Sequence, residues 1–195
     1  MSDNRTYNVL IVGVGGQGII LASDVLSKAA ALHGYDVKKN EIHGMAQRGG
    51  SVSSHVRFGK TVHSPIIRTG EADVLISFEL LETVRYWPFV SEKGKVIIND
   101  HRILPPAVFT GQQEYPANIL AEIKERIPDA LVVDGLEAAT KIGNPRVVNV
   151  VLLGMMSKFL DIPAEVYETV LKSSLKPKLV DINLKAFNQG RALAA

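Results

Sequence analysis

The chain has 195 residues, of which 46% are hydrophobic and 22% are charged, so it is large enough to bury a core without disulfides or metal. It contains no cysteine, which excludes disulfides, a cysteine nucleophile, thiolate-bound zinc and a cysteine-ligated iron–sulfur cluster on this chain. The net charge is +2, and the basic residues are scattered with few aromatic residues among them, which argues against nucleic-acid binding.

The first six residues are polar and lack the apolar core of a signal peptide. The apolar run at 147–156 is broken by Asn149 and is too short to span a bilayer. We therefore expect a cytoplasmic protein without a membrane segment. Eight basic residues but only four acidic residues lie within residues 1–70. This imbalance indicates either a solvated face or a half of the chain that meets an anionic ligand or partner.

Hydrophobic periodicity predicts alternating strands and helices up to residue 143. In chain order, we expect a strand at 7–12, a helix at 19–32, a strand at 35–39, a glycine-bounded loop at 44–50, and strands at 51–58 and 73–78. A helix at 80–86, a strand at 95–99, a helix at 119–127, a strand at 130–134 and a helix at 136–142 follow.

The last third of the chain is predicted to be helical, at 147–160, 164–175 and 182–193, with Pro163 and Pro177 between the helices. This order of elements predicts an α/β fold: a Rossmann-like, mostly parallel sheet with helices on both faces and a helical C-terminal third. No repeat or low-complexity linker divides the chain, so we expect a single domain over residues 1–195.

A glycine-rich loop follows the first predicted strand and opens the first predicted helix. It reads Gly13-Val14-Gly15-Gly16-Gln17-Gly18 and matches the G-x-G-x-x-G pattern of dinucleotide- and phosphate-binding loops. Glycines allow the backbone to approach a ligand closely, and a helix N-terminus attracts an anion. The same glycines can instead serve only close strand–helix packing. Gln17 can hydrogen-bond a ligand or a neighbouring chain, or can cap the turn.

A nicotinamide site usually has an acidic residue about 20 residues after the glycine loop, at the end of the second strand. Residues 37–41 read Val-Lys-Lys-Asn-Glu at that point. Lys38 and Lys39 would suit a phosphorylated ribose. The glycine loop therefore leaves open a free-standing nicotinamide- or flavin-dependent oxidoreductase.

A second motif, residues 41–51, reads Glu-Ile-His-Gly-Met-Ala-Gln-Arg-Gly-Gly-Ser and is expected in a loop after the second strand. Loops at the carboxyl ends of strands are where α/β sheets bind ligands. Arg48 offers a planar fork suited to a carboxylate or phosphate, and alternatively an ion pair within the chain or at an interface. His43 can carry protons near neutral pH, or can be a hydrogen-bonded structural histidine.

The two motifs together, residues 12–18 and 41–52, resemble the small, gamma-type domain of 2-oxoacid:ferredoxin oxidoreductases. The Met-Ala-Gln-Arg-Gly-Gly form of the second motif is similar to the indolepyruvate branch, in which the small subunit is called beta. The agreement extends along most of the chain, through residues 72–79, Glu82, Arg85, residues 149–154 and residues 162–163.

The resemblance implies a subunit of an enzyme that oxidatively decarboxylates a 2-oxoacid, transfers the acyl group to coenzyme A as co-substrate and passes electrons to ferredoxin. It implies that thiamine diphosphate, magnesium and iron–sulfur clusters belong to a large partner subunit, through which ferredoxin is reached, and that this chain alone binds no cofactor and is inert. It assigns no catalytic residue and no metal ligand here. The residues implied to line a ligand site or interface are Gly13, Gly15, Gly16, Gln17, Gly18, His43, Gln47 and Arg48. A third hypothesis is a non-catalytic module that senses an anion or acts as a scaffold.

Overall fold

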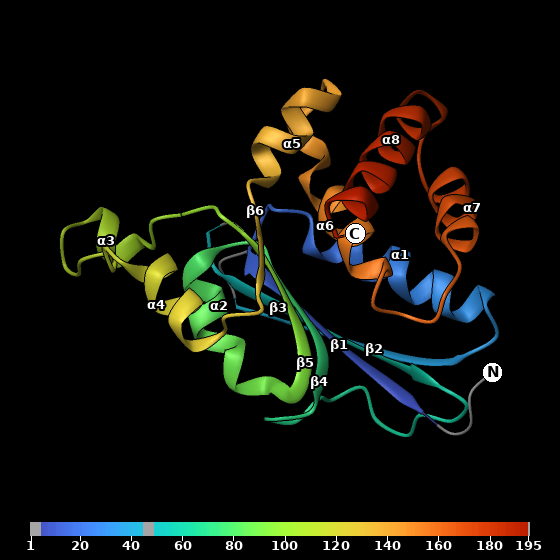
Figure 1. Ribbon diagram of the computed structural model, residues 1–195, viewed down its shortest axis with the longest axis horizontal. Helices are drawn as coiled ribbons and strands as arrows, with labels where there is room; N and C mark the ends of the chain where they lie inside the picture. Colours follow the sequence, from blue (N-terminus) through green and yellow to red (C-terminus); the bar gives the residue numbers. More distant parts are fainter. Residues whose placement is uncertain (1–4, 45–48, 195) are drawn as a thin grey trace.

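The computed structural model describes residues 5–44 and 49–194. Its centre is a sheet with the strand order β2-β3-β1-β4-β5-β6 (Figure 1). The strands are β1 (Thr6–Val14), β2 (Asp36–His43), β3 (Ser51–Gly59), β4 (Ala72–Ser77), β5 (Val90–Asn99) and β6 (Leu131–Val133). The helices are α1 (Ile19–Leu32), α2 (Leu80–Tyr86), α3 (Pro106–Phe109), α4 (Ile119–Arg126), α5 (Gly135–Ile142), α6 (Val148–Ser157), α7 (Ala164–Ser174) and α8 (Pro177–Leu193), with 3-10 turns at Trp87–Phe89 and Pro145–Val147.

The sheet is mostly parallel, as the sequence predicted. β1 pairs in parallel with β4, β4 with β5, and β5 with β6, whereas β3 pairs antiparallel with both β1 and β2. β3 is therefore the one strand of this sheet that runs against the others. The reason is local, because the short connection after β2 returns the chain directly alongside β2, and such a return produces an antiparallel pair.

β2 extends further than its sequence indicates. The strand was expected at 35–39, but its pairing with β3 continues to His43, which lies opposite Val52. Glu41 and His43, which we expected in a loop, are therefore strand residues. Hydrogen bonds from β3 hold this polar segment extended, and its position at the edge of the sheet leaves one side open to solvent.

Other boundaries also differ from those predicted. α8 begins at Pro177 rather than near 182, because proline fits the first turn of a helix, where its missing N–H is not needed. β5 begins at Val90 rather than at residue 95 and passes through Gly94 by means of an irregularity in its pairing with β4. The short helix α3 was not predicted.

Helices cover both faces of the sheet, and alternate residues of β1 divide the core between them. Val9 and Ile11 belong to the core on the face covered by α1 and the C-terminal helices (Figure 1). Leu10 and Val12 belong to the core beneath α2 and α4 on the other face. The prediction of helices on both faces with a helical C-terminal third is confirmed. Among the described residues, no helix is long and apolar enough to cross a membrane.

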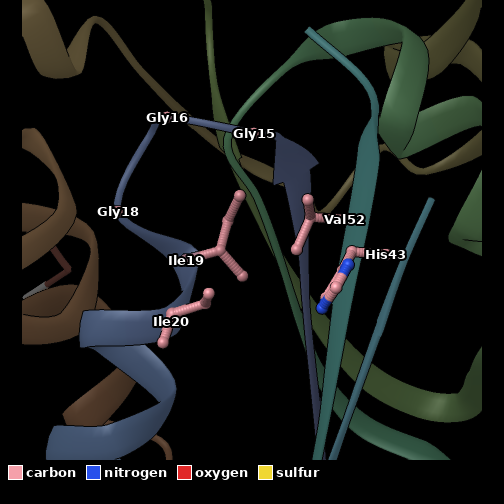
Figure 2. Close-up of a pocket in the computed structure, with 7 residues that line it drawn as sticks. All are labelled: Gly15, Gly16, Gly18, Ile19, Ile20, His43 and Val52. Atoms are coloured by element: carbon pink, nitrogen blue, oxygen red, sulfur yellow. The ribbon is translucent and has the colours of Figure 1, made fainter. Parts of the chain in front are cut away.

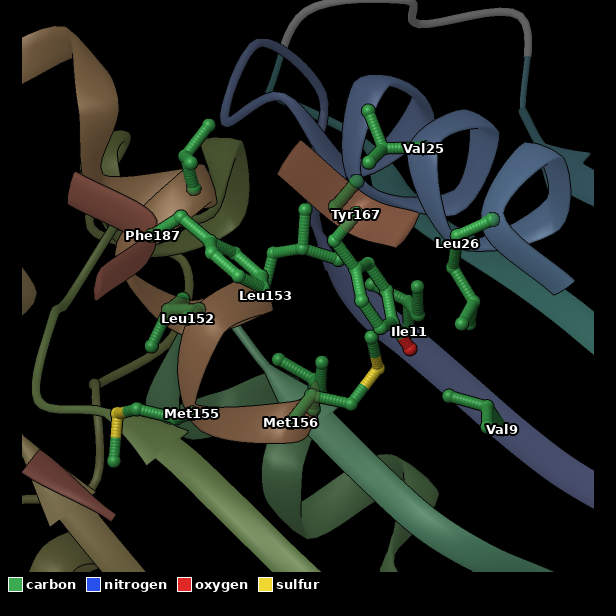
Figure 3. Close-up of a cluster of buried hydrophobic side chains, with 14 of the residues drawn as sticks. Val9, Ile11, Val25, Leu26, Leu152, Leu153, Met155, Met156, Tyr167 and Phe187 are labelled. Carbon is green, nitrogen blue, oxygen red and sulfur yellow. The ribbon is translucent and has the colours of Figure 1, made fainter. Parts of the chain in front are cut away.

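The C-terminal helices pack unusually tightly on α1 and on one another. Every residue of α6 after Val148 is buried, and Figure 3 shows α6 side chains surrounded by Tyr167 of α7, Phe187 of α8 and residues of α1 and β1. Gly154 in α6 and Gly190 in α8 allow the backbones of the two helices to cross in close contact. A Cβ atom on Gly190 would lie 1.9 Å from the carbonyl oxygen of Val151, and one on Gly154 would lie 2.1 Å from that of Phe187.

We predict that Gly190→Ala lowers the free energy of unfolding by about 3 kcal/mol or more, because the new methyl group meets rigid backbone and forces the helices apart. Helix propensity alone would favour alanine by roughly 1 kcal/mol. Urea denaturation measures the difference. Gly44→Ala is the control, because its Cβ would have nothing within 4 Å and the expected change is below about 0.5 kcal/mol. An increase in stability for Gly190→Ala would contradict the close crossing.

Candidate functional site

The two sequence motifs meet at the carboxyl edge of the sheet. Val14, the last residue of β1, lies opposite Ser51, the first residue of β3. The backbone N–H of Gly15 donates to the carbonyl oxygen of Gly50 at 2.8 Å, and that of Gly49 donates to Gly15 at 3.4 Å. The glycine loop and the end of the second motif therefore form one unit. Gln47 and Arg48 lie outside the described residues, so their predicted roles stay predictions.

The glycines of the first loop are needed for different physical reasons. Gly16 and Gly18 adopt the left-handed conformation, with φ of 104° and 86°. A Cβ on Gly18 would lie 2.5 Å from Nδ2 of Asn149, and one on Gly13 would lie 2.7 Å from Cβ of Phe78. Gly13 and Gly18 are thus required for close packing inside the chain. Around Gly16, in contrast, a Cβ would have nothing within 4 Å, so this backbone is open to a ligand or partner.

Gln17 caps the turn. Its Oε1 accepts a hydrogen bond from the backbone N–H of Val14 at 2.7 Å, and its Nε2 donates to the carbonyl oxygen of Phe78 at 2.9 Å. The same carbonyl accepts a bond from Nδ2 of Asn99 at 3.1 Å. Both polar ends of the Gln17 amide are therefore engaged within the chain, joining the end of β1 to the end of β4.

A first pocket, of about 410 Å³, lies between the glycine loop and β2. Its lining is Gly15, Gly16, Gly18, Ile19, Ile20, His43 and Val52. Figure 2 shows His43 and Val52 facing Ile19 and Ile20 across this space. The lining is mainly apolar, and the exposed His43 is its one ionisable side chain among the described residues. Its Nδ1 is 3.3 Å from the carbonyl oxygen of Gly44.

A second pocket, of about 440 Å³, lies on the other side of Gly16, toward β4 and β5. Its lining is Gly16, Gln17, Phe78, Asn99, His101, Leu136, Pro145, Arg146 and Val148. Each pocket is lined by one histidine, and the exposed Arg146 gives the second pocket a positive charge that the described lining of the first pocket lacks. The two pockets share Gly16 and lie on either side of β1. The connection after β1 leads to β2 at one edge of the sheet, whereas the connection after β4 leads to β5, toward the other edge. Ligands of open α/β sheets bind at such points.

The sequence reasoning missed His101 and Arg146. His101 follows the predicted strand at 95–99 by two residues, so the rule that ligands sit beyond carboxyl ends pointed to it. Arg146 carries no comparable signal, because it is brought to this edge only by the packing of α5 and α6.

The basic residues of the first part of the chain are largely paired with internal partners. Lys39 contacts Asp24 at 2.5 Å and Glu41 at 2.6 Å, and Lys38 pairs with Asp36. Arg57 donates to Asn8 and to the carbonyl oxygens of Ser64 and Ile66. Their charge is thus used inside the fold. Lys38 and Lys39 are committed to carboxylates, which weakens the case for a phosphorylated ribose beside them.

Two buried carboxylates lie behind the site, in the first turn of α2. Glu79 caps the helix by accepting the backbone N–H of Glu82 at 3.0 Å, and its other oxygen accepts bonds from Ile103 and Tyr115. Glu82 accepts a bond from Ser51 Oγ at 2.5 Å and pairs with Arg85 at 3.1 Å. Burial raises the pKa of Glu82 above its ordinary value, although Ser51 and Arg85 act in the opposite direction.

The chain offers no evident metal site in its described part. Within residues 5–44 and 49–194, no group of three or more His, Asp or Glu side chains is placed to hold a metal ion. With no cysteine in the sequence, the donor set for an iron–sulfur cluster is also missing.

Comparison with known proteins gives a consistent result over nearly the whole chain. The model of the family described as "Pyruvate ferredoxin/flavodoxin oxidoreductase" matches residues 8–193. A protein from Archaeoglobus fulgidus named "Indolepyruvate oxidoreductase subunit IorB" is 41% identical over 187 residues, which cover 94% of this chain and 92% of that protein.

Solved structures share the fold. A keto/oxoacid ferredoxin oxidoreductase gamma subunit from Geobacter sulfurreducens superposes with a TM-score of 0.70 at 23% identity, covering 96% of this chain and 98% of that one. A 2-oxoglutarate:ferredoxin oxidoreductase chain from Magnetococcus marinus gives a TM-score of 0.73 at 20% identity, covering 98% of this chain but 31% of that chain. The same fold therefore occurs both as a separate chain and as part of a longer one.

We predict that Gln17→Ala lowers the free energy of unfolding by about 2 kcal/mol, because the N–H of Val14 and the carbonyl of Phe78 each lose a partner at a half-buried site. Chemical denaturation measures the loss. The control is Gln113→Ala, which removes an exposed amide and should change stability by less than about 0.5 kcal/mol. Equal stability of the two variants would show that Gln17 does not hold the strand ends together.

Proposed function

The chain belongs to the pyruvate ferredoxin/flavodoxin oxidoreductase family, as its two motifs predicted, and we propose that it is the small subunit of an indolepyruvate:ferredoxin oxidoreductase. The observation that carries this is the 41% identity to the Archaeoglobus fulgidus subunit over almost the full length of both chains. The complex would oxidise an aryl 2-oxoacid with loss of carbon dioxide, form an acyl-coenzyme A and deliver electrons to ferredoxin.

In this proposal the redox chemistry belongs to a large partner subunit. An iron–sulfur cluster does not fit this chain, since it has no cysteine. We assign thiamine diphosphate and magnesium to the partner as well, and the described residues of this chain hold no group of three or more side chains for a metal ion. The small subunit would instead complete the surroundings of the ligands. We also propose that the complex is cytoplasmic.

The carboxyl edge of the sheet is the face that we assign to ligand and partner. Its two adjoining pockets have different chemistry, one mainly apolar and the other carrying Arg146 and His101. Aryl 2-oxoacids and coenzyme A each combine apolar and anionic parts, which suits that pairing. Exposed large hydrophobic side chains also lie at or after the carboxyl ends of four strands, at Ile20, Ile42, Leu104, Phe109 and Leu136. Such exposure is typical of a surface that a partner covers.

A free-standing nicotinamide or flavin enzyme has less support. Gln17 is engaged within the chain, Gly13 and Gly18 are explained by packing, and Lys39 is held by two carboxylates. These features account for the glycine motif without a dinucleotide.

We predict that this chain alone shows no oxoacid-dependent reduction of a viologen dye, whereas the chain co-purified with its large subunit reduces the dye when indolepyruvate and coenzyme A are added. The large subunit alone and pyruvate in place of indolepyruvate are the controls. Two separate peaks in gel filtration of the co-expressed chains, at micromolar concentration, would contradict the subunit assignment. Preference for pyruvate would leave the family intact and overturn the indolepyruvate assignment.

We further predict that Arg48→Ala in the assembled complex lowers kcat/KM for coenzyme A or indolepyruvate about ten- to hundredfold. The physical reason is the loss of one bidentate, charge-assisted contact of roughly 1.5–3 kcal/mol. Lysine should restore only part, because it lacks the planar fork. Arg68→Ala, which removes an exposed arginine after β3, is the control. Wild-type kinetics in a fully assembled Arg48→Ala complex would exclude a ligand role for Arg48.

A further inference from the structure

A buried carboxylate from α2 reaches β3 at the point where the two motifs meet. Glu82 Oε2 accepts the hydrogen bond of Ser51 Oγ at 2.5 Å, and its side chain is only 4% exposed. Ser51 is the first residue of β3, and the residue before it, Gly50, accepts the N–H of Gly15. The carboxylate of Glu82 is therefore connected to the glycine loop through Ser51 and Gly50.

Helix α2 does not need Glu82 in this position. Glu82 is the third residue of α2, where a glutamate often turns back to the N–H of the capping residue. Here the cap is supplied by Glu79, and the oxygens of Glu82 meet Ser51 and Arg85 instead. A buried carboxylate costs free energy relative to an apolar side chain of the same size. Its presence is thus better explained by what it holds than by the stability of α2.

Through this hydrogen bond Glu82 holds Gly50 and Ser51, which we call the stem of the second motif. Ser51 lies opposite Val14 in the β1–β3 ladder, and Val52, the next residue, lines the first pocket beside Gly15 and Gly16. α2 lies on the face of the sheet opposite α1 (Figure 1). Glu82 therefore acts from behind the sheet, away from the pocket whose wall it supports.

We propose that Glu82 is a positioning residue, which through Ser51 fixes the stem of the second motif against the glycine loop and so sets the wall of the first pocket. Its effect on ligand binding rests on the proposed function. Its effect on the loop does not, because the Gly15–Gly50 contact lies within this chain.

Hydrogen exchange of the Gly15 N–H in the full chain tests the proposal directly. We expect Glu82→Ala and Ser51→Ala each to raise its exchange rate about tenfold, relative to amides in the centre of β1, and the double variant to add little more. Glu82→Gln and Ser51→Thr keep an acceptor and a hydroxyl donor, so each should stay within about threefold of the wild type.

The matched control is Tyr115→Phe. It removes a half-buried hydrogen bond to Glu79, the carboxylate that caps α2, and leaves Ser51 and Glu82 in place. Its Gly15 exchange should match that of the wild type. An unchanged Gly15 rate in both alanine variants, or an equal rise in Tyr115→Phe, would overturn the proposal.

Kinetics of the assembled complex give the second readout. We expect Glu82→Ala and Ser51→Ala to raise KM for indolepyruvate or coenzyme A several-fold, with a smaller change in kcat, and Ser51→Thr to restore it. Wild-type KM values in active alanine complexes would overturn the positioning role. A wild-type complex without indolepyruvate activity would instead refute the proposed function, while the exchange rates would still decide the role of Glu82.

Discussion

Two amide side chains join four neighbouring segments at the carboxyl edge of the sheet, and the site depends on them. Gln17 connects the N–H of Val14 to the carbonyl of Phe78, and Asn99 connects that carbonyl to the N–H of Gly135 at the start of α5. Parallel strands leave backbone groups without partners where they end, and a buried group of this kind costs about 1–3 kcal/mol. By satisfying them with side chains, the fold can end its strands at one level and keep Gly16 open between two pockets.

Local signals were enough to predict the first half of this arrangement. The apolar run of β1, the glycines after it and the period of α1 all lie within about thirty residues, and the structure has α1 at the predicted residues. β1 is longer than predicted, because Gly13 and Val14 of the expected loop are its last two residues. The direction of β3 and the full length of β2 depend on pairing between strands, and neither follows from the composition of the segments. His43 lines the first pocket as the last residue of β2 and not as part of the loop in which it was expected, while its role as a ligand or interface residue stays a prediction.

The charged part of the site was the hardest to predict. The excess of basic residues before Gly70 left open a solvated face or a half that meets an anion, whereas Lys38, Lys39 and Arg57 are paired within the fold. The basic side chains that line the second pocket, His101 and Arg146, come from later in the chain and are separated by three helices and a strand. Net charge along a sequence is a poor guide where long side chains have carboxylates within reach across a sheet.

The first turn of α2 gives these edge loops a common anchor. Glu82 holds the beginning of β3, while Glu79 accepts bonds from Ile103 and Tyr115, on either side of the excursion that carries α3. Both loops are thus tied at their bases to one helix behind the sheet, and in the loop that carries α3 the side chain of Phe109 is 82% exposed. Loops fixed at their bases keep a defined position on the sheet edge, which suits the role that we propose for the small subunit. In the proposed division of labour, a chain that has no cysteine, and whose described residues hold no metal-binding group, belongs to a family of redox enzymes without carrying the redox groups itself.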